Sequence, residues 1–366
     1  MAKFTIGTSE LKKVIDQVSP MFVGGIDNLP RILFNVGKKV EISATNGDAY
    51  TKVEFDCDIE EKGSFVVPGK IFENIVKKSA SEKIEISTDK NDENKLSILI
   101  GNVKYQLVLV DIHPGYFEAP EFDKSNSFSI NAQDLKSAIE AVSCCVDSAK
   151  PHLNCVMIHT DAKQEGKIFI VATDGMRLGI AERNGKNDNP VPNLMVPKKS
   201  AEYIVKMLGD VEDEINVDYT ENMVKISVRG ISYTTKLLDT AFPKYQSVIP
   251  TSNNKTLEVK TSDLKDTIKS ISLAAEITFR IKLEIKKDSV YISCEDNGNN
   301  ADGTIEGTFT EADPMQLVCN FRLLMEILEN IGSSIIRIQI NNESTPMLIR
   351  SVDDESVKYV FMPFVS

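Results

Sequence analysis

Residues 4–19 read FTIGTSELKKVIDQVS, and the same pattern returns as FSINAQDLKSAIEAVS at 128–143 and as LEVKTSDLKDTIKSIS at 257–272. Each copy opens with apolar residues at every second position and continues with apolar residues at i, i+3, i+4 and i+7. This change of period predicts a strand that runs directly into an amphipathic helix. The copies lie about 125 residues apart, a domain-sized spacing rather than that of a solenoid. The sequence therefore predicts three similar domains.

A second strand and helix also occur three times. The matching stretches are SFVVPGKIFENIVKK (64–78), NLMVPKKSAEYIVKM (193–207) and MQLVCNFRLLMEILE (315–329). Pro68 and Pro197 stand where a helix starts, where a missing N–H costs nothing, and Asn320 takes that place in the third copy as a possible cap. A closing hairpin of alternating pattern follows each helix, which indicates antiparallel strands with one covered face.

These repeats predict an α+β fold in which each domain has antiparallel sheets and two helices. Proline-containing segments at 111–127 and 239–256 are interpreted as linkers. The expected domains are residues 1–124, 125–252 and 253–366. In the closing hairpins, Tyr105, Tyr233 and Tyr359 occupy one repeat position.

The composition is that of an ordinary globular protein, and no apolar run approaches the length of a membrane span. The N-terminus has no signal-peptide pattern, so a cytoplasmic location is expected. The six cysteines form no CxxC pair, and buried reduced thiols are the better interpretation.

The net charge of −12 argues at first against nucleic acid, but the charges are unevenly placed. The six predicted helices carry twelve basic and ten acidic residues, a balance of +2, so the remainder of the chain carries −14. One repeat position holds Lys12, Lys136 and Lys265, and another holds Lys70, Lys199 and Arg322. A lysine-rich helix is common on any protein surface, but six in register favour a shared role.

No catalytic motif for nucleotide, metalloprotease or serine hydrolase chemistry is present. The three histidines occur in contexts where a structural role is commoner than a catalytic one. Asp56 and Asp58 are expected on one face of a strand, which leaves a metal-dependent nuclease as a rival hypothesis. The loop Cys294–Gly303 lacks the glycine and glutamate that an EF-hand requires, so a polar turn is expected. A second rival is a periodic scaffold that never meets DNA.

Two further segments are the most individual: VATDGMRL at 171–178 and the apolar end KYVFMPFVS at 358–366. At these residues the chain resembles the bacterial DNA polymerase III beta subunit family, the sliding clamps. The segments that carry the resemblance span the whole length: NLPRILFNV (28–36), VPGKIFENIVKK (67–78), KPHLNCV (150–156), VATDGMRL (171–178), AFPKYQSVIP (241–250) and YVFMP (359–363).

The resemblance implies a non-catalytic protein without a cofactor or bound metal. It implies tandem DNA-clamp domains in two chains that associate head to tail as a closed ring of six domains. The helices would line the hole, and the ring would encircle duplex DNA without reading its sequence, held by topology instead of affinity. A small positive balance suits weak contact, because firm phosphate contacts would act as brakes. The residues expected to face DNA are Lys12, Lys70, Lys136, Lys198, Lys199, Lys265 and Arg322.

The resemblance also implies a hydrophobic cleft that binds short linear motifs of the polymerase catalytic subunit, the clamp loader and other replication and repair proteins. The positions that match it are Leu153, Thr173, Gly175, Met176, Arg177, Leu178, Pro243, Val248, Phe279, Asn320, Pro346, Val360, Met362 and Pro363. Ring-closing contacts match Tyr105 and Leu107 of one chain against Leu273 and Ala274 of the other. The family usually ends in MPMRL or similar, whereas this chain ends Met362-Pro363-Phe364-Val365-Ser366. With Cys155 and Ser247 also departing from the family pattern, a different peptide preference is expected.

Overall fold

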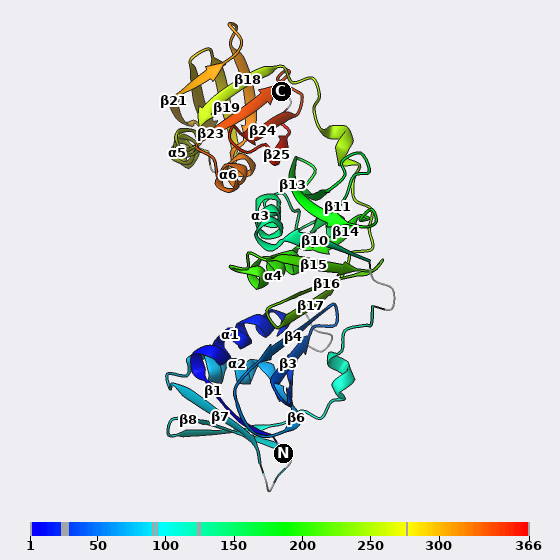
Figure 1. Ribbon diagram of the computed structural model, residues 1–366. Helices are drawn as coiled ribbons and strands as arrows, with labels where there is room; N and C mark the ends of the chain where they lie inside the picture. Colours follow the sequence, from blue (N-terminus) through cyan, green and yellow to red (C-terminus); the bar gives the residue numbers. More distant parts are fainter. Residues whose placement is uncertain are drawn as a thin grey trace. The chain divides into compact units, whose positions relative to one another are not determined.

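The structure is a computed structural model that describes residues 2–22, 29–89, 92, 94–122, 126–275 and 277–364. The chain forms two compact units, residues 1–129 with 206–237, and residues 130–205 with 238–366. The central repeat is thus divided, and each unit contains parts of two repeats (Figure 1). Two elements contain the points of division: β10 (Asn126–Asn131) and α4 (Lys198–Leu208).

The first unit contains two antiparallel sheets and two helices. The order of the first sheet is β5 (Asp58–Glu61), β1 (Lys3–Gly7), β7 (Lys83–Thr88), β8 (Lys95–Ile100) and β9 (Val103–Val108). The order of the second is β6 (Gly63–Pro68), β2 (Arg31–Val36), β3 (Val40–Thr45), β4 (Ala49–Phe55), β17 (Ile231–Lys236), β16 (Met223–Val228) and β15 (Glu214–Tyr219). Helices α1 (Thr8–Val18) and α2 (Gly69–Lys78) lie side by side (Figure 1). The pairing of β4 with β17 makes one sheet out of strands from two repeats.

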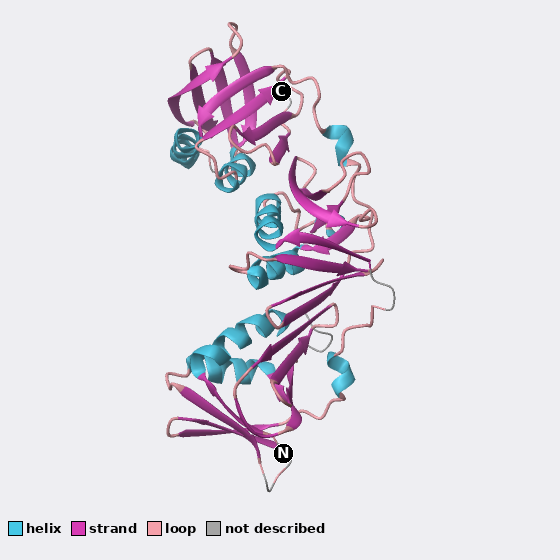
Figure 2. Ribbon diagram, viewed as in Figure 1, coloured by secondary structure: helices cyan, strands magenta, loops and turns pink. Residues whose placement is uncertain are grey.

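The second unit repeats this plan. Its long sheet has the order β14 (Leu194–Pro197), β11 (Cys155–His159), β12 (Lys167–Thr173), β13 (Arg177–Asn187), β25 (Val357–Phe361), β24 (Met347–Ser351), β23 (Ile335–Ile340), β18 (Lys255–Lys260) and β21 (Asn299–Phe309). Strand β21 also pairs with β20 (Ser289–Asp296), β20 pairs with β19 (Arg280–Lys286), and β19 pairs with β22 (Met315–Asn320). The helices are α3 (Ala132–Ser143), α5 (Thr261–Ile271) and α6 (Phe321–Asn330). Figure 2 shows α5 and α6 together beside the strands of the third repeat. Again a strand from the middle of one repeat, β13, pairs with the last strand of the next, β25.

The predicted α+β architecture with antiparallel sheets and two helices in each repeat is confirmed. In the first helix of every copy the apolar stripe is buried, as for Leu11, Leu135 and Leu264. The side chain of Asn320 accepts hydrogen bonds from the backbone N–H groups of Arg322 and Leu323, at 3.0 and 3.3 Å, which confirms the predicted cap of α6.

Other details differ from the sequence-based expectations or refine them. Asp56 and Asp58 do not share a strand face, because β4 ends at Phe55 and β5 begins at Asp58. The Asp56 carboxylate instead lies 3.1 Å from the ammonium group of Lys39. The two interpreted linkers contain short 3-10 helices, η2 (Pro114–Phe117) and η4 (Tyr245–Val248). Another, η3 (Pro151–Leu153), precedes β11, while η1 (Ser19–Phe22) and η5 (Ser272–Ala274) extend α1 and α5.

Candidate functional site

The segment Thr173–Arg177 forms a tight turn between β12 and β13. The Thr173 hydroxyl donates to the Arg177 carbonyl at 2.7 Å, and a carboxylate oxygen of Asp174 accepts from the N–H groups of Met176 and Arg177, both at 2.8 Å. Gly175 has φ +90°, a conformation that glycine adopts without a side-chain penalty. The turn places the Met176 side chain on the surface, where it is 41% exposed.

The first repeat contains the same turn between β3 and β4. The Thr45 hydroxyl donates to the Ala49 carbonyl at 2.7 Å, Asn46 accepts from the Ala49 N–H at 2.8 Å, and Gly47 also has φ +90°. The turn is therefore a structural element that the first and second repeats share. Only its side chains, such as Met176, distinguish the copy in the second repeat.

The C-terminal strand β25 runs along this turn. Leu178 lies opposite Val360 in the β13–β25 pairing, and the N–H of Met362 donates to the Met176 carbonyl at 2.9 Å. The register of β24 and β25, in which Met347 lies opposite Phe361, places Pro346 beside Met362. The apolar chain end is thus packed, and Phe364 continues it by donating its N–H to the Val318 carbonyl at 2.7 Å. Val365 and Ser366 lie outside the described residues.

An apolar cluster forms beneath this surface. Leu178, Val360 and Tyr245 belong to it, all less than a tenth exposed. The Tyr245 hydroxyl lies 2.8 Å from Nε2 of His159, whose Nδ1 lies 3.0 Å from the carbonyl of Thr160. Burial lowers the pKa of His159 and raises the pKa of Tyr245 to about 12. Since the Thr160 carbonyl only accepts, Nδ1 carries the proton and Nε2 accepts from tyrosine.

The predicted cleft residues therefore differ in accessibility. Leu153, Thr173, Leu178, Val360 and Pro363 are buried. Gly175, Met176, Pro243 and Val248 are exposed, and Val248 is 50% exposed. Phe279, Asn320, Pro346 and Met362 are intermediate. The sequence did not distinguish the buried positions from the exposed ones, and the assignment of all of them to one cleft stays a prediction.

Phe279 and Arg322 form a separate part of this region. The guanidinium carbon of Arg322 lies 3.6 Å from the centre of the Phe279 ring, a cation–π contact. The Phe321 ring packs edge-on against the same phenylalanine with centroids 6.0 Å apart. Arg322 was expected to face DNA and Phe279 to line the cleft, so one residue of each predicted set is in contact with the other.

Arg177 is the most connected residue of the site, and its side chain is only 4% exposed. Its Nε donates to Asp174 at 3.0 Å, Nη1 to the Leu323 carbonyl at 2.8 Å, and Nη2 to the Cys144 carbonyl and to a Glu326 carboxylate oxygen. Burial lowers its pKa, but the hydrogen bond to Glu326 and nearby negative charges more than offset this, so the pKa is raised. The guanidinium is therefore an internal tie between the second and third repeats. Its assignment as a peptide-contacting residue remains a prediction.

The predicted DNA-facing residues fall into two groups. In the first helices, Lys12, Lys136 and Lys265 are half-buried, and Lys12 donates to the Ser79 carbonyl at the end of α2 at 2.7 Å. In the second helices, Lys70, Lys199 and Arg322 are exposed. Lys198 is half-buried and donates to the Ser148 hydroxyl at 3.1 Å. Solvent reaches the second position most freely in all three repeats.

The predicted dimer residues lie on the edge strand β9 and in the 3-10 helix η5. Tyr105 is 37% exposed on β9, whereas Leu107 on the same strand is buried at 8%. Leu273 is 81% exposed in η5, beside the half-buried Ala274. Sequence reasoning missed three exposed apolar neighbours, Val103 and Val108 on β9 and Ile277 after η5. The sequence of β9 has apolar residues on both faces of the strand, and this pattern could have indicated that Val103 and Val108 are exposed.

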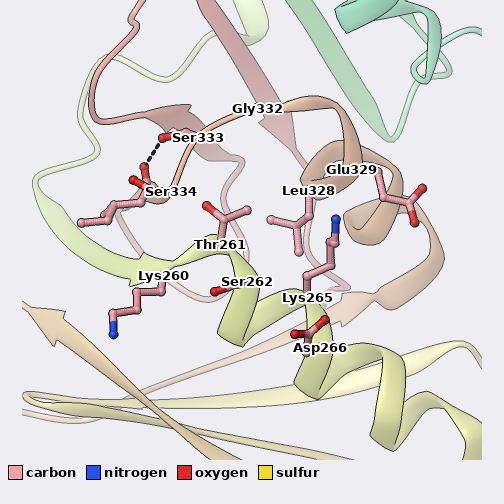
Figure 3. Close-up of a pocket in the computed structure, with 11 residues that line it drawn as sticks. Lys260, Thr261, Ser262, Lys265, Asp266, Leu328, Glu329, Gly332, Ser333 and Ser334 are labelled. Carbon is pink, nitrogen blue, oxygen red and sulfur yellow. Dashed lines mark hydrogen bonds between the residues drawn. The ribbon is translucent and has the colours of Figure 1, made fainter.

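The cavity in Figure 3 is distinct from the apolar surface. It has a volume of about 550 Å³ and lies between the start of α5 and the end of α6, with Lys260, Thr261 and Lys265 on its wall. In the described ranges, no group of three or more His, Cys, Asp or Glu residues is placed to hold a metal ion. No helix in the described part of the chain is long and apolar enough to cross a membrane.

Residues 2–113, 129–244 and 246–365 match, in that order, the N-terminal, central and C-terminal domains of the DNA polymerase III beta subunit. The chain belongs to this family. Its members are beta sliding clamps, so the protein is a DNA sliding clamp, a non-catalytic processivity factor of DNA polymerase III.

Individual relatives agree with the family assignment. The chain is 24% identical to the beta sliding clamp of Vibrio cholerae over 371 residues, which cover 99% of both chains, and 26% identical to that of Rickettsia felis over 88% of both. Among solved structures, a sliding clamp from Bartonella birtlesii bound to griselimycin superimposes with a TM-score of 0.90 at 23% identity, covering both chains fully. The DNA polymerase III subunit beta of Pseudomonas aeruginosa gives the same TM-score at 20% identity and full coverage. The sliding-clamp fold therefore extends over the whole chain.

Proposed function

We propose that two copies of this sliding clamp close head to tail into a ring around duplex DNA and tether the replicative polymerase to it. The observation that carries the proposal is the repeated joint between repeats. A strand from the middle of one repeat pairs with the last strand of the next, β4 with β17 and β13 with β25. In the third repeat, β21 corresponds to β4 and β13. In the first repeat, β9 corresponds to β17 and β25.

Both of these strands have exposed edges. Among the strands that the structure describes, β9 has β8 as its one hydrogen-bonded neighbour, and β21 meets β18 only along 307–309. An exposed strand edge is a template for pairing with another chain. We therefore assign β9 of one subunit and β21 of the other as the ring-closing pair. The exposed Tyr105 lies on β9, and the exposed Leu273 lies in η5.

The repeats also specify which residues of β21 face β9. Ser43 and Ser293 are equivalent, because each lies opposite the third residue of the preceding strand, Leu33 in β2 or Lys282 in β19. Ser43 pairs with Lys52, and Ser293 pairs with Asp302. Asp302 thus takes the place of Lys52 in the third repeat.

In the first joint, Lys52 lies opposite Ser232, the residue before Tyr233. Tyr233 corresponds to Tyr105, so the residue before it is Lys104. The proposed interface therefore places Lys104 of one subunit opposite Asp302 of the other. Both side chains are exposed in the single chain and carry opposite charges.

For DNA, we propose that the exposed second-helix position carries the main contacts. Lys70, Lys199 and Arg322 occupy it. The half-buried lysines of the first helices contribute positive potential with less direct contact. Few phosphate contacts give a shallow salt dependence, which suits a protein that must move along the duplex.

For partners, we propose that the apolar surface around Met176, Val248 and Met362 binds short linear motifs of the polymerase, the clamp loader and other replication and repair proteins. Two exposed apolar side chains above a buried apolar floor, edged by polar groups, are the usual recipe for anchoring such a motif. We retain the domain limits 1–124, 125–252 and 253–366 as our proposal, and expect the protein to act in the bacterial cytoplasm with the replication machinery.

Retention on DNA tests the proposed ring. After loading, the protein should stay on a closed circular duplex and be lost when one restriction cut linearises it. Capping both ends of the linear duplex with bulky protein blocks should restore retention. Equal loss from circular and linear DNA would contradict encirclement. Cleavage of labelled DNA in the presence of magnesium would instead favour the nuclease rival.

The peptide surface needs a separate test, because Leu178 is a core residue and its truncation would disturb the fold. Val248→Ala combined with Met362→Ala removes surface contacts, and we expect it to weaken binding of a polymerase C-terminal peptide in fluorescence anisotropy. Ile335→Ala, which truncates an exposed apolar residue elsewhere, is the matched control. Unchanged affinity in the double variant would reject this placement.

A further inference from the structure

Cys144 and Cys145 place two thiols in contact at the end of α3. Their sulfur atoms are 3.8 Å apart. Cys144 is half-buried and Cys145 is fully buried. Among the six cysteines, all of which the structure describes, this is the one pair with such a sulfur–sulfur contact.

The surroundings of the pair favour a reactive outer thiol. The hydrogen bond from Cys145 lowers the pKa of the Cys144 thiol, burial opposes this, and the Arg177 guanidinium assists it. The Cys145 thiol, whose pKa is raised well above its usual value, keeps its proton. One nucleophilic sulfur is therefore backed by a second thiol at contact distance.

The pair is also built into the tie between repeats. The Cys144 carbonyl accepts a hydrogen bond from Arg177, and the Cys145 sulfur lies against Gly179, where an added Cβ would be only 3.2 Å from it. The Tyr359 hydroxyl donates to the Ala141 carbonyl, one turn earlier in α3, at 2.8 Å. A change at the two sulfurs would therefore act on the backbone that Arg177 holds.

We propose that Cys144 and Cys145 form a dithiol site for trivalent arsenic and that organoarsenicals of the type R–As=O bind there. Nothing in the clamp function requires such a site, and the proposal does not depend on ring closure or peptide binding. Adjacent thiols can satisfy two coordination positions of one arsenic atom, as an isolated cysteine cannot. Cys144, the more accessible member, provides the first contact.

The reaction balances without an oxidant. The Cys144 sulfur attacks arsenic and the Cys145 sulfur follows, so two As–S bonds replace the arsenic–oxygen bond. The two thiol protons leave with that oxygen as water. Arsenic remains trivalent throughout, and the product is a cyclic dithioarsinite that joins the two side chains.

Phenylarsine oxide provides a direct test on the full-length reduced protein. We expect native mass spectrometry to show one phenylarsenic group per chain, and thiol titration after unfolding to fall from six free thiols to four. An excess of 2-mercaptoethanol should leave the adduct in place, and ethanedithiol should remove it. That difference distinguishes a chelate from an adduct on one sulfur.

Variants locate the site. Cys144→Ser and Cys145→Ser should each lose the thiol-resistant adduct, whereas Cys57→Ser, which removes the other half-buried cysteine, should keep it. If Cys145→Ser fails to fold by circular dichroism, Cys144→Ser decides the question. An adduct that survives in Cys144→Ser, an adduct that 2-mercaptoethanol strips, or no adduct on the wild-type chain would each overturn the proposal.

Discussion

At the scale of single residues, Arg177 has a structural role that its local sequence does not indicate. The family resemblance implies that it belongs to the peptide-binding cleft, and this assignment stays a prediction. The structure also buries its side chain among Asp174, Glu326 and two backbone carbonyls. Two of these partners are about 150 residues away in sequence, so no local pattern could indicate them.

We expect Arg177→Ala to destabilise the second unit strongly. The alanine takes a charged donor away from Asp174 and from two backbone carbonyls, and the loss of a hydrogen bond to a charged group costs about 1.5–3 kcal/mol. Urea unfolding monitored by far-UV circular dichroism measures the loss. Arg177→Lys keeps the charge but not the fork of donors and should recover only part of it. Wild-type stability in the alanine variant would contradict the role of a tie.

His159 should make stability depend on pH. Burial lowers its pKa in the folded protein below the ordinary value of 6.5. Between these two values the unfolded chain binds more protons, so this contribution is fully present above pH 6.5 and is lost as the pH falls through the folded pKa. His159→Gln lacks the effect, and its stability difference from wild type should shrink on acidification. A difference that stays constant from pH 8 to pH 5 would refute this.

At the scale of elements, the three copies of the first helix begin in chemically different ways. In α3 the Asn131 side chain accepts from the N–H groups of Gln133 and Asp134, at 2.9 and 3.2 Å. Gly7 and Lys260 hold the same position in α1 and α5 without a side-chain cap in the described structure. Lys260 also places a positive charge at the positive end of the helix dipole.

Lys260→Asn should therefore stabilise the third repeat. Lys260 already has the extended conformation of a capping residue, φ −67° and ψ 128°. The asparagine adds a cap worth about 1 kcal/mol and removes an unfavourable charge. Thermal unfolding followed by calorimetry measures the gain, and the reverse change Asn131→Lys should lower the stability of the second repeat. A destabilising Lys260→Asn change would show that the lysine has another structural role.

Helices and caps were predictable from the sequence because their determinants are local. The helical period of the apolar residues predicted every helix, and Asn320 was predicted to be an N-cap because asparagine is a favoured capping residue. Strand ends were harder, as Asp56 and Asp58 show, because a break between strands depends on partners elsewhere in the sheet. Burial was harder still, since Leu178 and Met176 are two residues apart yet lie in the core and on the surface.

At the scale of the whole molecule, the proposed ring closes through two symmetry-related joints between subunits, each a copy of the joint that occurs twice within every chain. The Lys104 and Asp302 register follows from those two copies. Lys104→Asp alone and Asp302→Lys alone each place like charges opposite one another, which destabilises a strand pair. We expect each single variant to dissociate at higher protein concentration than wild type in analytical ultracentrifugation.

The combined Lys104→Asp and Asp302→Lys variant tests the pairing itself. Restoring opposite charges should return the dimer toward wild-type strength, an effect of about 0.2–1 kcal/mol for exposed pairs. Lys39→Asp, the same charge reversal in the turn between β2 and β3, is the control for net charge and should leave association unchanged. Failure of the double variant to recover would place these two residues away from each other.

The strand joints also determine where such a ring would open. Within one chain, β4 and β17 are connected covalently through the linker, as are β13 and β25, so a broken pair re-forms at a high effective concentration. The same pairing between subunits has no tether, and its closure depends on how much protein is present. Nearly identical hydrogen-bonded joints would therefore differ in lifetime only because of chain connectivity. A loader would need no special weak point in the fold, because the absence of a peptide link makes the subunit joint the first to part.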